Sequence, residues 1–255
     1  MRNGLRGLQP WILPALLIAA WQFAVQGGLL SSRVLPAPTE VFAAGWRLAA
    51  SGELAEHIGV SFLRAATGFA IGGGIGFALG LFNGLSDTAE RLLDSSLQMI
   101  RNVPHLALIP LVILWFGIDE EAKLFLVSLG VFFPIYLNTF HGIRNVDFQL
   151  VEMGRSYGMS RTALFTQVIL PGALPSVLVG LRYALGIMWL TLIVAETIAA
   201  TSGIGYLAMN AREFMLVDVV VFSIIVYALL GKLADSSARF LERLCLQWHP
   251  AFQRS

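Results

Sequence analysis

Apolar residues in this chain gather into long, nearly continuous runs that are separated by shorter polar stretches. A helix needs about 20 apolar residues to cross a bilayer, so runs of this length predict membrane-spanning helices. Together they predict an all-α polytopic membrane protein in which residues 1–255 form a single transmembrane domain. The six expected spans cover residues 11–30, 61–83, 97–116, 122–140, 174–200 and 215–236.

The composition agrees with a membrane protein. Charged residues make up 13% of the chain and hydrophobic residues 56%, whereas soluble domains carry roughly 25% charged residues. The net charge of +1 gives no reason to expect a nucleic-acid partner. The single cysteine, Cys245, excludes an internal disulfide, and the four histidines show no metal-ligand spacing.

The basic residues predict the orientation in the membrane. Six spans place both termini on one side, and cytoplasmic segments carry an excess of Lys and Arg. If the termini are inside, nine basic residues are cytoplasmic and four are outside, so we expect cytoplasmic N- and C-termini. The inner residues are Arg2, Arg6, Arg91, Arg144, Arg155, Arg161, Arg239, Arg243 and Arg254, and the outer ones are Arg33, Arg47, Lys123 and Arg212.

The first apolar run admits two interpretations. Arg2 and Arg6 precede it, as basic residues precede the core of a signal sequence. The run is long for a signal core, and no small-x-small cleavage site follows it. We therefore expect it to be a retained first span.

The segment between the first two apolar runs, residues 31–60, predicts a short helix of its own. Pro36 and Pro38 break the chain, and Thr39 is placed to cap a helix that starts near Glu40. The mixture of aromatic, aliphatic and basic residues that follows is typical of an amphipathic interfacial helix. A connector lying on the membrane surface is the favoured interpretation, and a segment that contacts substrate is the alternative.

Five glycines in the second apolar run are spaced four residues apart. On a helix, such a spacing forms one ridge of small residues along which another helix packs closely in lipid. Either a moving or dimer-forming interface or static packing within one subunit fits the pattern. The ridge consists of Gly68, Gly72, Gly76, Gly80 and Gly84.

Ionisable residues inside apolar runs are costly and are therefore candidates for function. Glu196 stands late in the fifth run, and Arg101 and His105 stand early in the third, one helical turn apart on one face. Snorkelling of Arg101 and a position along a transport path are equally compatible with its place. Arg64 and Arg182 lie near span ends, where snorkelling to the interface is the simpler explanation.

Proline predicts a break in the third run. Pro104 and Pro110 each remove a backbone hydrogen bond and permit a kink. A broken helix beside Arg101 and His105 is a place for a gate, although kinks that serve packing alone are as common.

The longest polar stretch between two apolar runs, residues 145–172, predicts two short helices joined at a glycine; we call it the elbow. Asn145 or Asp147 can cap the first helix, expected over Phe148–Tyr157, and Gly158 is placed to end it. A second short helix is predicted after Gly158. Ser160 can cap it, and Pro171 and Pro175 then direct the chain back towards the membrane.

The elbow resembles the Glu-Ala-Ala loop of binding-protein-dependent importers of the ATP-binding-cassette superfamily. That pattern is Glu-Ala-Ala, three residues, Gly, nine residues, Ile-x-Leu-Pro. Val168 stands in place of the isoleucine, and Met153 and Gly154 stand in place of the two alanines. The residues in register are Glu152, Gly158, Leu170 and Pro171.

The resemblance extends over most of the chain, from about Pro10 to Ala251. The runs Arg101–Asp119, Met188–Glu196 and Ser202–Phe214 resemble the aliphatic sulfonate branch of these importers, with taurine, nitrate and bicarbonate permeases as near relatives. The resemblance implies the type I importer permease fold, also called MetI-like, in a bacterial inner membrane.

The same resemblance implies partners and a division of labour. The elbow, with Glu152, Arg155 and Arg161 exposed for contact, would dock on a cytoplasmic ATPase. Two ATPase subunits, a second copy of the permease and a periplasmic or lipid-tethered binding protein would complete the importer. This chain would be non-catalytic and bind no cofactor, with ATP and Mg²⁺ on the ATPase. Its Gly231-Lys232 pair lacks the upstream glycine of a phosphate-binding loop.

An alkanesulfonate carries one delocalised negative charge and an apolar tail, so its path should offer scattered donors between apolar walls. We expect Glu196 to be paired or hydrogen-bonded, since a free carboxylate would repel the anion. The segment Thr201–Phe214 is either a re-entrant loop facing a binding protein or a rigid connector. Candidate path residues are Arg101, Asn102, His105, Asn138, Thr139, Glu196 and Asn210.

Two other kinds of function remain open at this point. The same machine could carry taurine, nitrate, bicarbonate or a vitamin precursor, since specificity resides largely in the binding protein. An ion-coupled carrier is a different class, but it should show inverted repeats and paired acids at mid-membrane, and Glu196 is the single clear acid there. A membrane enzyme should show a constellation of catalytic residues, and we find none in the sequence.

Overall fold

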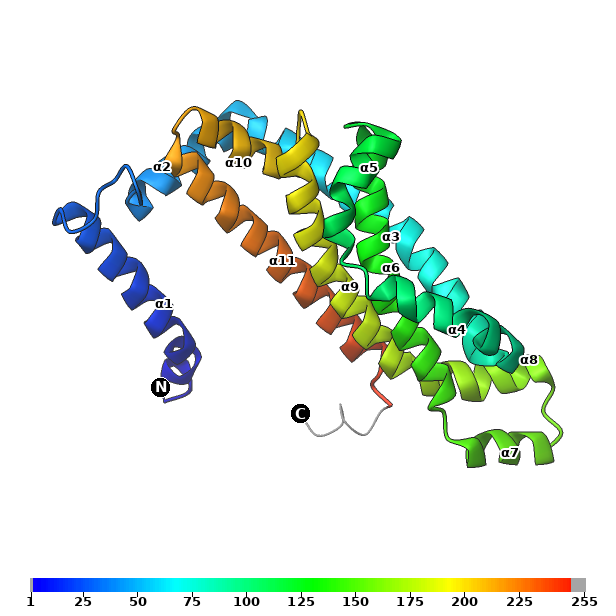
Figure 1. The fold of residues 1–255 in the computed structure, drawn as a ribbon. Helices are drawn as coiled ribbons and strands as arrows, with labels where there is room; N and C mark the ends of the chain where they lie inside the picture. Colours follow the sequence, from blue (N-terminus) through cyan, green and yellow to red (C-terminus); the bar gives the residue numbers. More distant parts are fainter. Residues whose placement is uncertain (1, 249–255) are drawn as a thin grey trace. The chain divides into compact units, whose positions relative to one another are not determined.

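The computed structural model describes the backbone of residues 2–248 and the side chains of residues 12–198 and 200–248. All of its elements are helical (Figure 1). In chain order they are α1 (Arg2–Gln26), α2 (Pro38–Ser51), α3 (Glu53–Leu85), α4 (Asp87–Arg101), the 3₁₀-helix η1 (His105–Leu108), α5 (Ile109–Phe116), α6 (Glu120–Arg144), α7 (Phe148–Ser156), α8 (Arg161–Leu164), the π-helix η2 (Phe165–Ile169), α9 (Leu170–Ala199), α10 (Ile204–Glu213) and α11 (Val217–Cys245).

Four helices of the described chain are long and apolar enough to cross a membrane, namely α3, α6, α11 and the continuous helix Arg161–Ile198. The pair formed by α4 and His105–Phe116 adds a fifth if the two count as one bent span, and Ile12–Gln26 is a shorter apolar helix. The predicted all-helical membrane protein is thereby confirmed. Arg254 and the end of the resemblance near Ala251 lie outside the described residues, as do the side chains of Arg2 and Arg6.

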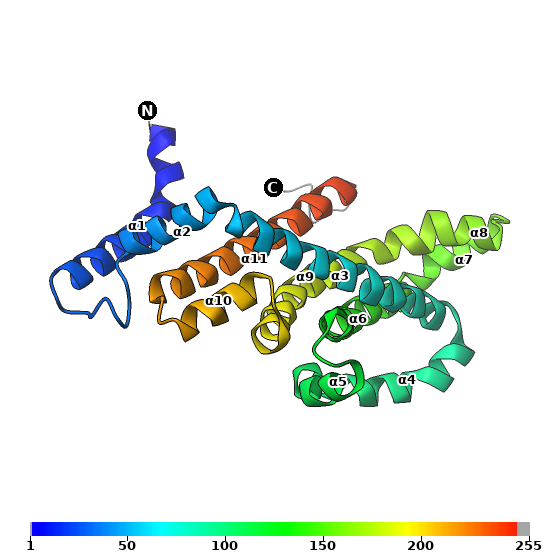
Figure 2. The same ribbon diagram turned by 90° about the horizontal axis from the view of Figure 1, so that it is seen from above.

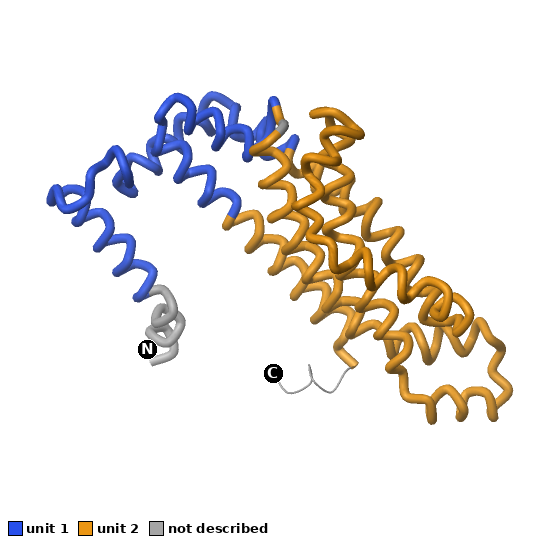
Figure 3. Tube along the Cα trace, viewed as in Figure 1, with its two compact units in different colours: residues 1–60, 201–227 blue, residues 61–200, 228–255 orange. Residues whose placement is uncertain are grey.

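The chain divides into two compact units, residues 1–60 with 201–227 and residues 61–200 with 228–255 (Figure 3). Unit 1 packs α2 against α10 and the start of α11. Gly45 of α2 lies directly against the Phe222 ring, so a side chain at position 45 would clash with that ring. The apolar core of unit 1 consists of Ala44, Leu48, Leu207, Ala211 and Val219.

The amphipathic helix predicted between the first two spans exists as α2, but its cap differs from the expectation. Thr39 lies inside the first turn, where its hydroxyl accepts a hydrogen bond from Gln22 at 3.3 Å. The position before the helix is Ala37, whose backbone N–H donates to the Glu40 carboxylate at 2.9 Å. Pro38 starts the helix because its missing N–H costs nothing in the first turn.

In unit 2, α6 is the central helix, and the glycine ridge of α3 packs along it. A Cβ added at Gly76 would lie 2.6 Å from the carbonyl oxygen of Phe132, and one at Gly80 would lie 2.7 Å from the Cβ of Thr139. The ridge therefore serves close packing within one subunit, which settles the question that the glycine spacing left open.

Helix α9 packs against another face of α6 and runs antiparallel to it (Figure 1). Small residues again allow the approach: a Cβ at Gly180 would lie 2.5 Å from the Cβ of Asn138. The Ser176 hydroxyl donates to the Asn138 carbonyl at 2.8 Å, which adds a hydrogen bond between the two helices. Two small-residue contacts thus fix α3 and α9 on α6.

The third predicted span is broken. Helices α4 and His105–Phe116 meet at an angle of 77°, and Pro104 precedes the second helix at the bend. Figure 2 shows α5 beside α6, whereas α4 lies apart from α6. Arg101 therefore ends one helix while His105 begins the next, and the expectation that they share one face of a continuous helix is wrong. The predicted interruption next to these residues is confirmed.

Candidate functional site

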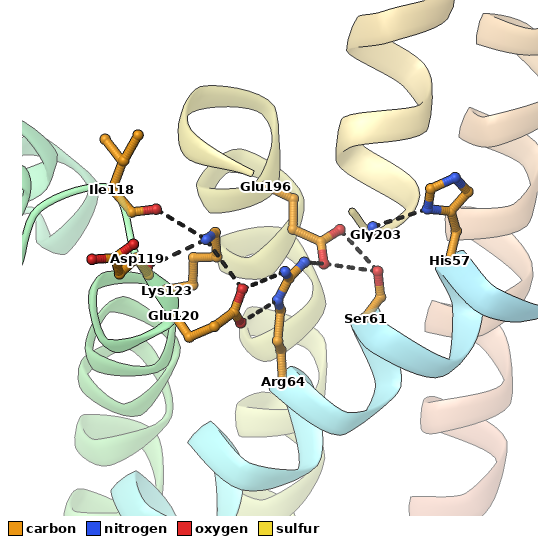
Figure 4. Close-up of polar contacts among 9 residues, drawn as sticks. All are labelled: His57, Ser61, Arg64, Ile118, Asp119, Glu120, Lys123, Glu196 and Gly203. Carbon is orange, nitrogen blue, oxygen red and sulfur yellow. Dashed lines mark hydrogen bonds and ion pairs between the residues drawn. The ribbon is translucent and has the colours of Figure 1, made fainter. Parts of the chain in front are cut away.

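A network of ion pairs, most of whose members are buried, joins α3, α6 and α9 in unit 2 (Figure 4). Arg64 of α3 is 4% exposed, and its guanidinium donates to Glu196 of α9 at 2.8 Å. The Ser61 hydroxyl lies 2.8 Å and 2.9 Å from the two Glu196 oxygens. Glu196 is thus paired and hydrogen-bonded, as predicted. Arg64 is buried in an ion pair, so its interpretation as a snorkelling residue is wrong.

The same arginine binds a second carboxylate. Its Nε and Nη2 each lie 2.6 Å from an oxygen of Glu120, which begins α6. Lys123 Nζ lies 3.4 Å from Glu120 and 3.1 Å from the Ile118 carbonyl oxygen. The buried Arg64, Lys123 and Glu196 are thus joined by Glu120, whose side chain is 55% exposed, and the opposite charges offset much of the cost of burying the three.

Unit 1 contains a buried histidine in its own polar contact. The backbone N–H of Gly203 donates to Nδ1 of His57 at 3.1 Å (Figure 4). Gly203 has φ 107°, a conformation that favours glycine, and it precedes α10. Helix α10 has a buried apolar side, so the stretch after the fifth span is a structured helix rather than an open loop.

The elbow forms by the local signals that the sequence carries. Asp147 caps α7 by accepting from Gln149 N at 2.8 Å, and Ser160 caps α8 by accepting from Ala163 N at 3.2 Å. Gly158 ends α7 with φ 75°. The Met159 N–H bonds to the Gly154 carbonyl at 3.1 Å, which completes the hydrogen-bond pattern typical of a glycine-terminated helix.

The elbow differs from the expectation in how the chain continues after α8. Pro171 stands at the start of α9 and Pro175 lies inside it, yet the helix is continuous from Arg161 to Ile198 through the π-turn η2. The π-turn Phe165–Ile169 is a local widening of an otherwise α-helical segment, as is usual for π-turns within helices. The elbow therefore continues directly into α9 at one end.

The residues of the Glu-Ala-Ala-like pattern fall into two groups in the elbow, one exposed and one buried. Glu152, Arg155 and Arg161 are exposed, and Met153 is 52% exposed. Gly154, in contrast, is buried: a Cβ there would lie 2.8 Å from Leu164 Cδ1 and 3.0 Å from Met159 Sδ. The small residue at position 154 thus allows α7 to pack on α8 inside the elbow. Leu170 and Pro171 are half-buried at the start of α9.

The candidate path residues do not form one site but lie in several parts of the structure. Arg101, His105 and Asn138 line one cavity of unit 2, between the end of α4, η1, α6 and α9. Asn102 is exposed at the end of α4, and Thr139 is fully buried against the glycine ridge. Glu196 belongs to the ion-pair network, and Asn210 lies half-buried on α10 of unit 1.

Sequence reasoning missed several polar groups. Ser61, Glu120 and Lys123 were not linked to Glu196, although a buried arginine and a buried glutamate in neighbouring spans suggest each other as partners. Asn83 donates to the Tyr136 hydroxyl at 2.8 Å in the α3–α6 interface. Among the described residues, no group of His, Cys, Asp and Glu could hold a metal ion.

The helical bundle, its membrane-length helices and the elbow define a multi-pass membrane permease. Residues 70–245 match the family described as binding-protein-dependent transport system inner membrane component, and the chain belongs to this family. It is thus a non-catalytic membrane subunit of an ABC transporter and lies in the inner membrane. Membership also implies an ATPase and a binding protein as partners.

Two relatives cover almost the whole chain. An aliphatic sulfonates transport permease protein, SsuC, of Escherichia coli (strain K12) is 65% identical over 99% of this chain and 96% of its own length. The taurine transport system permease protein TauC of the same organism is 36% identical over 94% of this chain and 89% of its own length. The resemblance to the aliphatic sulfonate branch is confirmed.

A solved structure supports the fold. A chain of the MetNI methionine ABC transporter, in an inward-facing conformation, superimposes with a TM-score of 0.52 at 18% identity. The match covers 73% of this chain and 93% of that chain. The MetI-like fold expected from the sequence is therefore confirmed.

Proposed function

We propose that this chain is the permease subunit of an ATP-driven importer that carries aliphatic sulfonates across the inner membrane to supply sulfur. The observation that carries this proposal is the 65% identity to an aliphatic sulfonates transport permease protein, over 99% of the chain. A match over 99% of the chain spans the elbow, the broken third span and the helices that line the cavity.

The proposed topology has six spans in one domain, residues 1–255, with both termini in the cytoplasm. Helix α1 forms the first span, and the bent α4–η1–α5 pair forms the third, which together with the four long helices makes six. The distribution of basic residues supports cytoplasmic termini. In this orientation the elbow faces the cytoplasm.

The elbow docks on the ATPase in this proposal. Leu150, Met153 and Tyr157 are 48%, 52% and 82% exposed and stand three and four residues apart, so they form an apolar stripe on α7. Glu152 and Arg155 add exposed charges beside the stripe. An apolar helix face rimmed by charges is the surface that a groove on a partner recognises.

The importer then contains two copies of this permease and two ATPase subunits, with a binding protein that delivers the sulfonate. ATP and Mg²⁺ are bound by the ATPase. Closure of the two ATPases moves the two elbows, and because α8, η2 and α9 form one continuous helix, the movement is carried directly into the membrane domain.

Growth of a deletion strain tests whether the importer carries alkanesulfonates. A strain lacking this permease, and any redundant system, should fail to grow with an alkanesulfonate as the only sulfur source and should grow normally on sulfate. Restoring the chain should restore growth. Normal growth of the deletion strain on alkanesulfonate would refute the sulfonate assignment.

Taurine is the second candidate, since TauC is 36% identical over 94% of this chain. Taurine is itself a sulfonate but carries an ammonium group. A deletion strain that loses growth on taurine and keeps growth on unsubstituted alkanesulfonates would favour this alternative.

A charge reversal tests the elbow. Glu152→Arg should reduce co-purification of the ATPase and substrate-stimulated ATP hydrolysis while membrane insertion stays normal. Glu213→Arg on α10 makes the same change at an exposed residue outside the elbow and serves as the control. Unchanged co-purification and hydrolysis in Glu152→Arg would show that the elbow does not dock there.

A further inference from the structure

A cavity of about 470 Å³ lies in unit 2, lined by the end of α4, η1, α6 and α9. Pockets that hold small ligands range from about 300 to 1,000 Å³, so this volume suits a small molecule. The cavity exists because the third span bends by 77° at Pro104, which separates α4 from α6 instead of packing the two helices along their length.

One cation stands at this cavity. Arg101 ends α4 and is exposed, and among the side chains that the structure describes no carboxylate lies within ion-pair distance of it. The contrast with Arg64 is direct, since that guanidinium is buried and engages Glu120 and Glu196. Arg101 therefore keeps its donors available, and a guanidinium binds an oxyanion through two parallel hydrogen bonds.

The remaining wall is mainly apolar. Leu108, Leu129, Phe133, Leu137 and Ile187 line it, from η1, α6 and α9. A surface of this kind takes an alkyl chain, and burial of each CH₂ group contributes about 0.8 kcal/mol. The cavity thus combines one anion-binding group with a wall for a hydrocarbon tail.

The polar side chains in the wall are held in place by the protein itself. His105 Nε2 lies 3.0 Å from the Thr191 hydroxyl, which fixes the imidazole ring against α9. The Asn138 amide donates to the Pro134 carbonyl at 2.8 Å. Both groups are oriented before any ligand arrives, so they add a defined polar edge to the site rather than mobile charges.

We infer that this cavity binds the alkanesulfonate during translocation, with the sulfonate at Arg101 and the alkyl tail along the wall formed by Leu108, Phe133 and Leu137. The inference rests on the proposed function and adds to it a specificity site within the permease itself. Arg101 is the single Lys or Arg among the residues that line the cavity, so the anion is held without the deep trap that several arginines would form, and release remains possible.

Binding to the permease–ATPase complex in nanodiscs, without binding protein, tests the site directly. Radiolabelled hexanesulfonate should bind saturably. Arg101→Gln should weaken binding at least tenfold, and Arg101→Lys should retain most of it. Arg91→Gln, which removes an exposed arginine of the same helix, should leave binding unchanged. Equal binding by wild type and Arg101→Gln, or absence of saturable binding in wild type, would overturn the inference.

Uptake into proteoliposomes with the complete importer provides the second arm. Leu137→Phe reduces the volume beside the tail, so the variant should lose uptake of long-chain sulfonates and keep that of methanesulfonate. An unchanged chain-length profile in Leu137→Phe, together with undiminished uptake of all sulfonates by Arg101→Gln, would refute the cavity site while leaving the proposed function intact. Absence of sulfonate uptake by the wild-type importer would refute the proposed function itself. Loss of the permease dimer in Leu137→Phe, with an unchanged profile, would assign the cavity to a second copy.

Discussion

Arg64 and Glu196 form an ion pair in the interior of unit 2, with 2.8 Å between Nη1 and Oε1 and side chains that are 4% and 0% exposed. The pair joins α3 to α9, two helices that contact α6 through small residues. Two charges at such depth persist only because each neutralises the other and further hydrogen bonds complete the shell.

Removing one partner of this pair should destabilise the protein more than removing both. Arg64→Met leaves the carboxylate of Glu196 without its guanidinium, and loss of one partner of a buried pair costs about 3–5 kcal/mol. Glu196→Met should cost less, since Arg64 keeps Glu120. The double variant should be more stable than Arg64→Met alone. Thermal unfolding in detergent measures all three.

A control variant distinguishes the loss of a buried charge from the loss of any negative charge. Glu121→Gln removes an exposed carboxylate next to Glu120 in the first turn of α6, and its midpoint should lie close to that of the wild type. If the double variant is as unstable as the sum of the two single variants, Arg64 and Glu196 are not energetically coupled and the ion pair does not stabilise the fold.

The sequence predicted half of this pair. An acid within an apolar run must be neutralised, so Glu196 was expected to have a partner. Arg64 lies three residues into its predicted span, and at that position an arginine is usually explained by snorkelling. The partner of Glu196 depends on how α3 packs on α6 and α9. The hydrophobic pattern of a single span does not predict this tertiary packing.

Local signals predicted the elbow more completely. Asp147, Gly158 and Ser160 act through hydrogen bonds and backbone angles within a few residues, so their roles follow from the sequence alone. Arg101 and His105 show the opposite case. Their relative placement depends on the angle at Pro104, and proline predicts a break but not its direction.

A leucine at Gly72 should disrupt unit 2, whereas a leucine at Gly74 should not. A Cβ at Gly72 would clash with the backbone carbonyl of Ser128, which cannot move without shifting α6, and overpacking of this kind costs about 1–3 kcal/mol or more. A Cβ at Gly74, in contrast, would meet nothing within 4 Å apart from the neighbouring backbone of its own helix. Thermal unfolding and expression level compare the two variants.

Gly74→Leu is a matched control for Gly72→Leu, because both variants replace a glycine of the same helix with leucine. Equal stability of both would show that the glycine ridge does not pack on α6. Equal loss of stability would instead point to a second protein surface that covers Gly74, such as another copy of the chain.

Gly158 should resist replacement for conformational reasons alone. Its φ is 75°, yet a Cβ there would contact nothing within 4 Å. Gly158→Ala should therefore cost roughly 1 kcal/mol through backbone strain, and Gly158→Asn should cost less, because asparagine adopts this conformation more readily. Thermal unfolding of the permease checks the order. A larger loss of ATPase co-purification in Gly158→Asn than in Gly158→Ala would mean that the residue contacts the ATPase through its surface.

Gly154→Ala should preserve both the elbow and its coupling. The added methyl group would lie 2.8 Å from Leu164 Cδ1 and 3.0 Å from Met159 Sδ, and both atoms are at the ends of flexible side chains. Alanine also favours the helix by about 1 kcal/mol over glycine, which offsets the crowding. Gly154→Leu should separate α7 from α8 and reduce ATPase co-purification. If Gly154→Ala alone abolishes co-purification while thermal stability is unchanged, position 154 faces the ATPase in the assembled importer rather than the interior of the elbow.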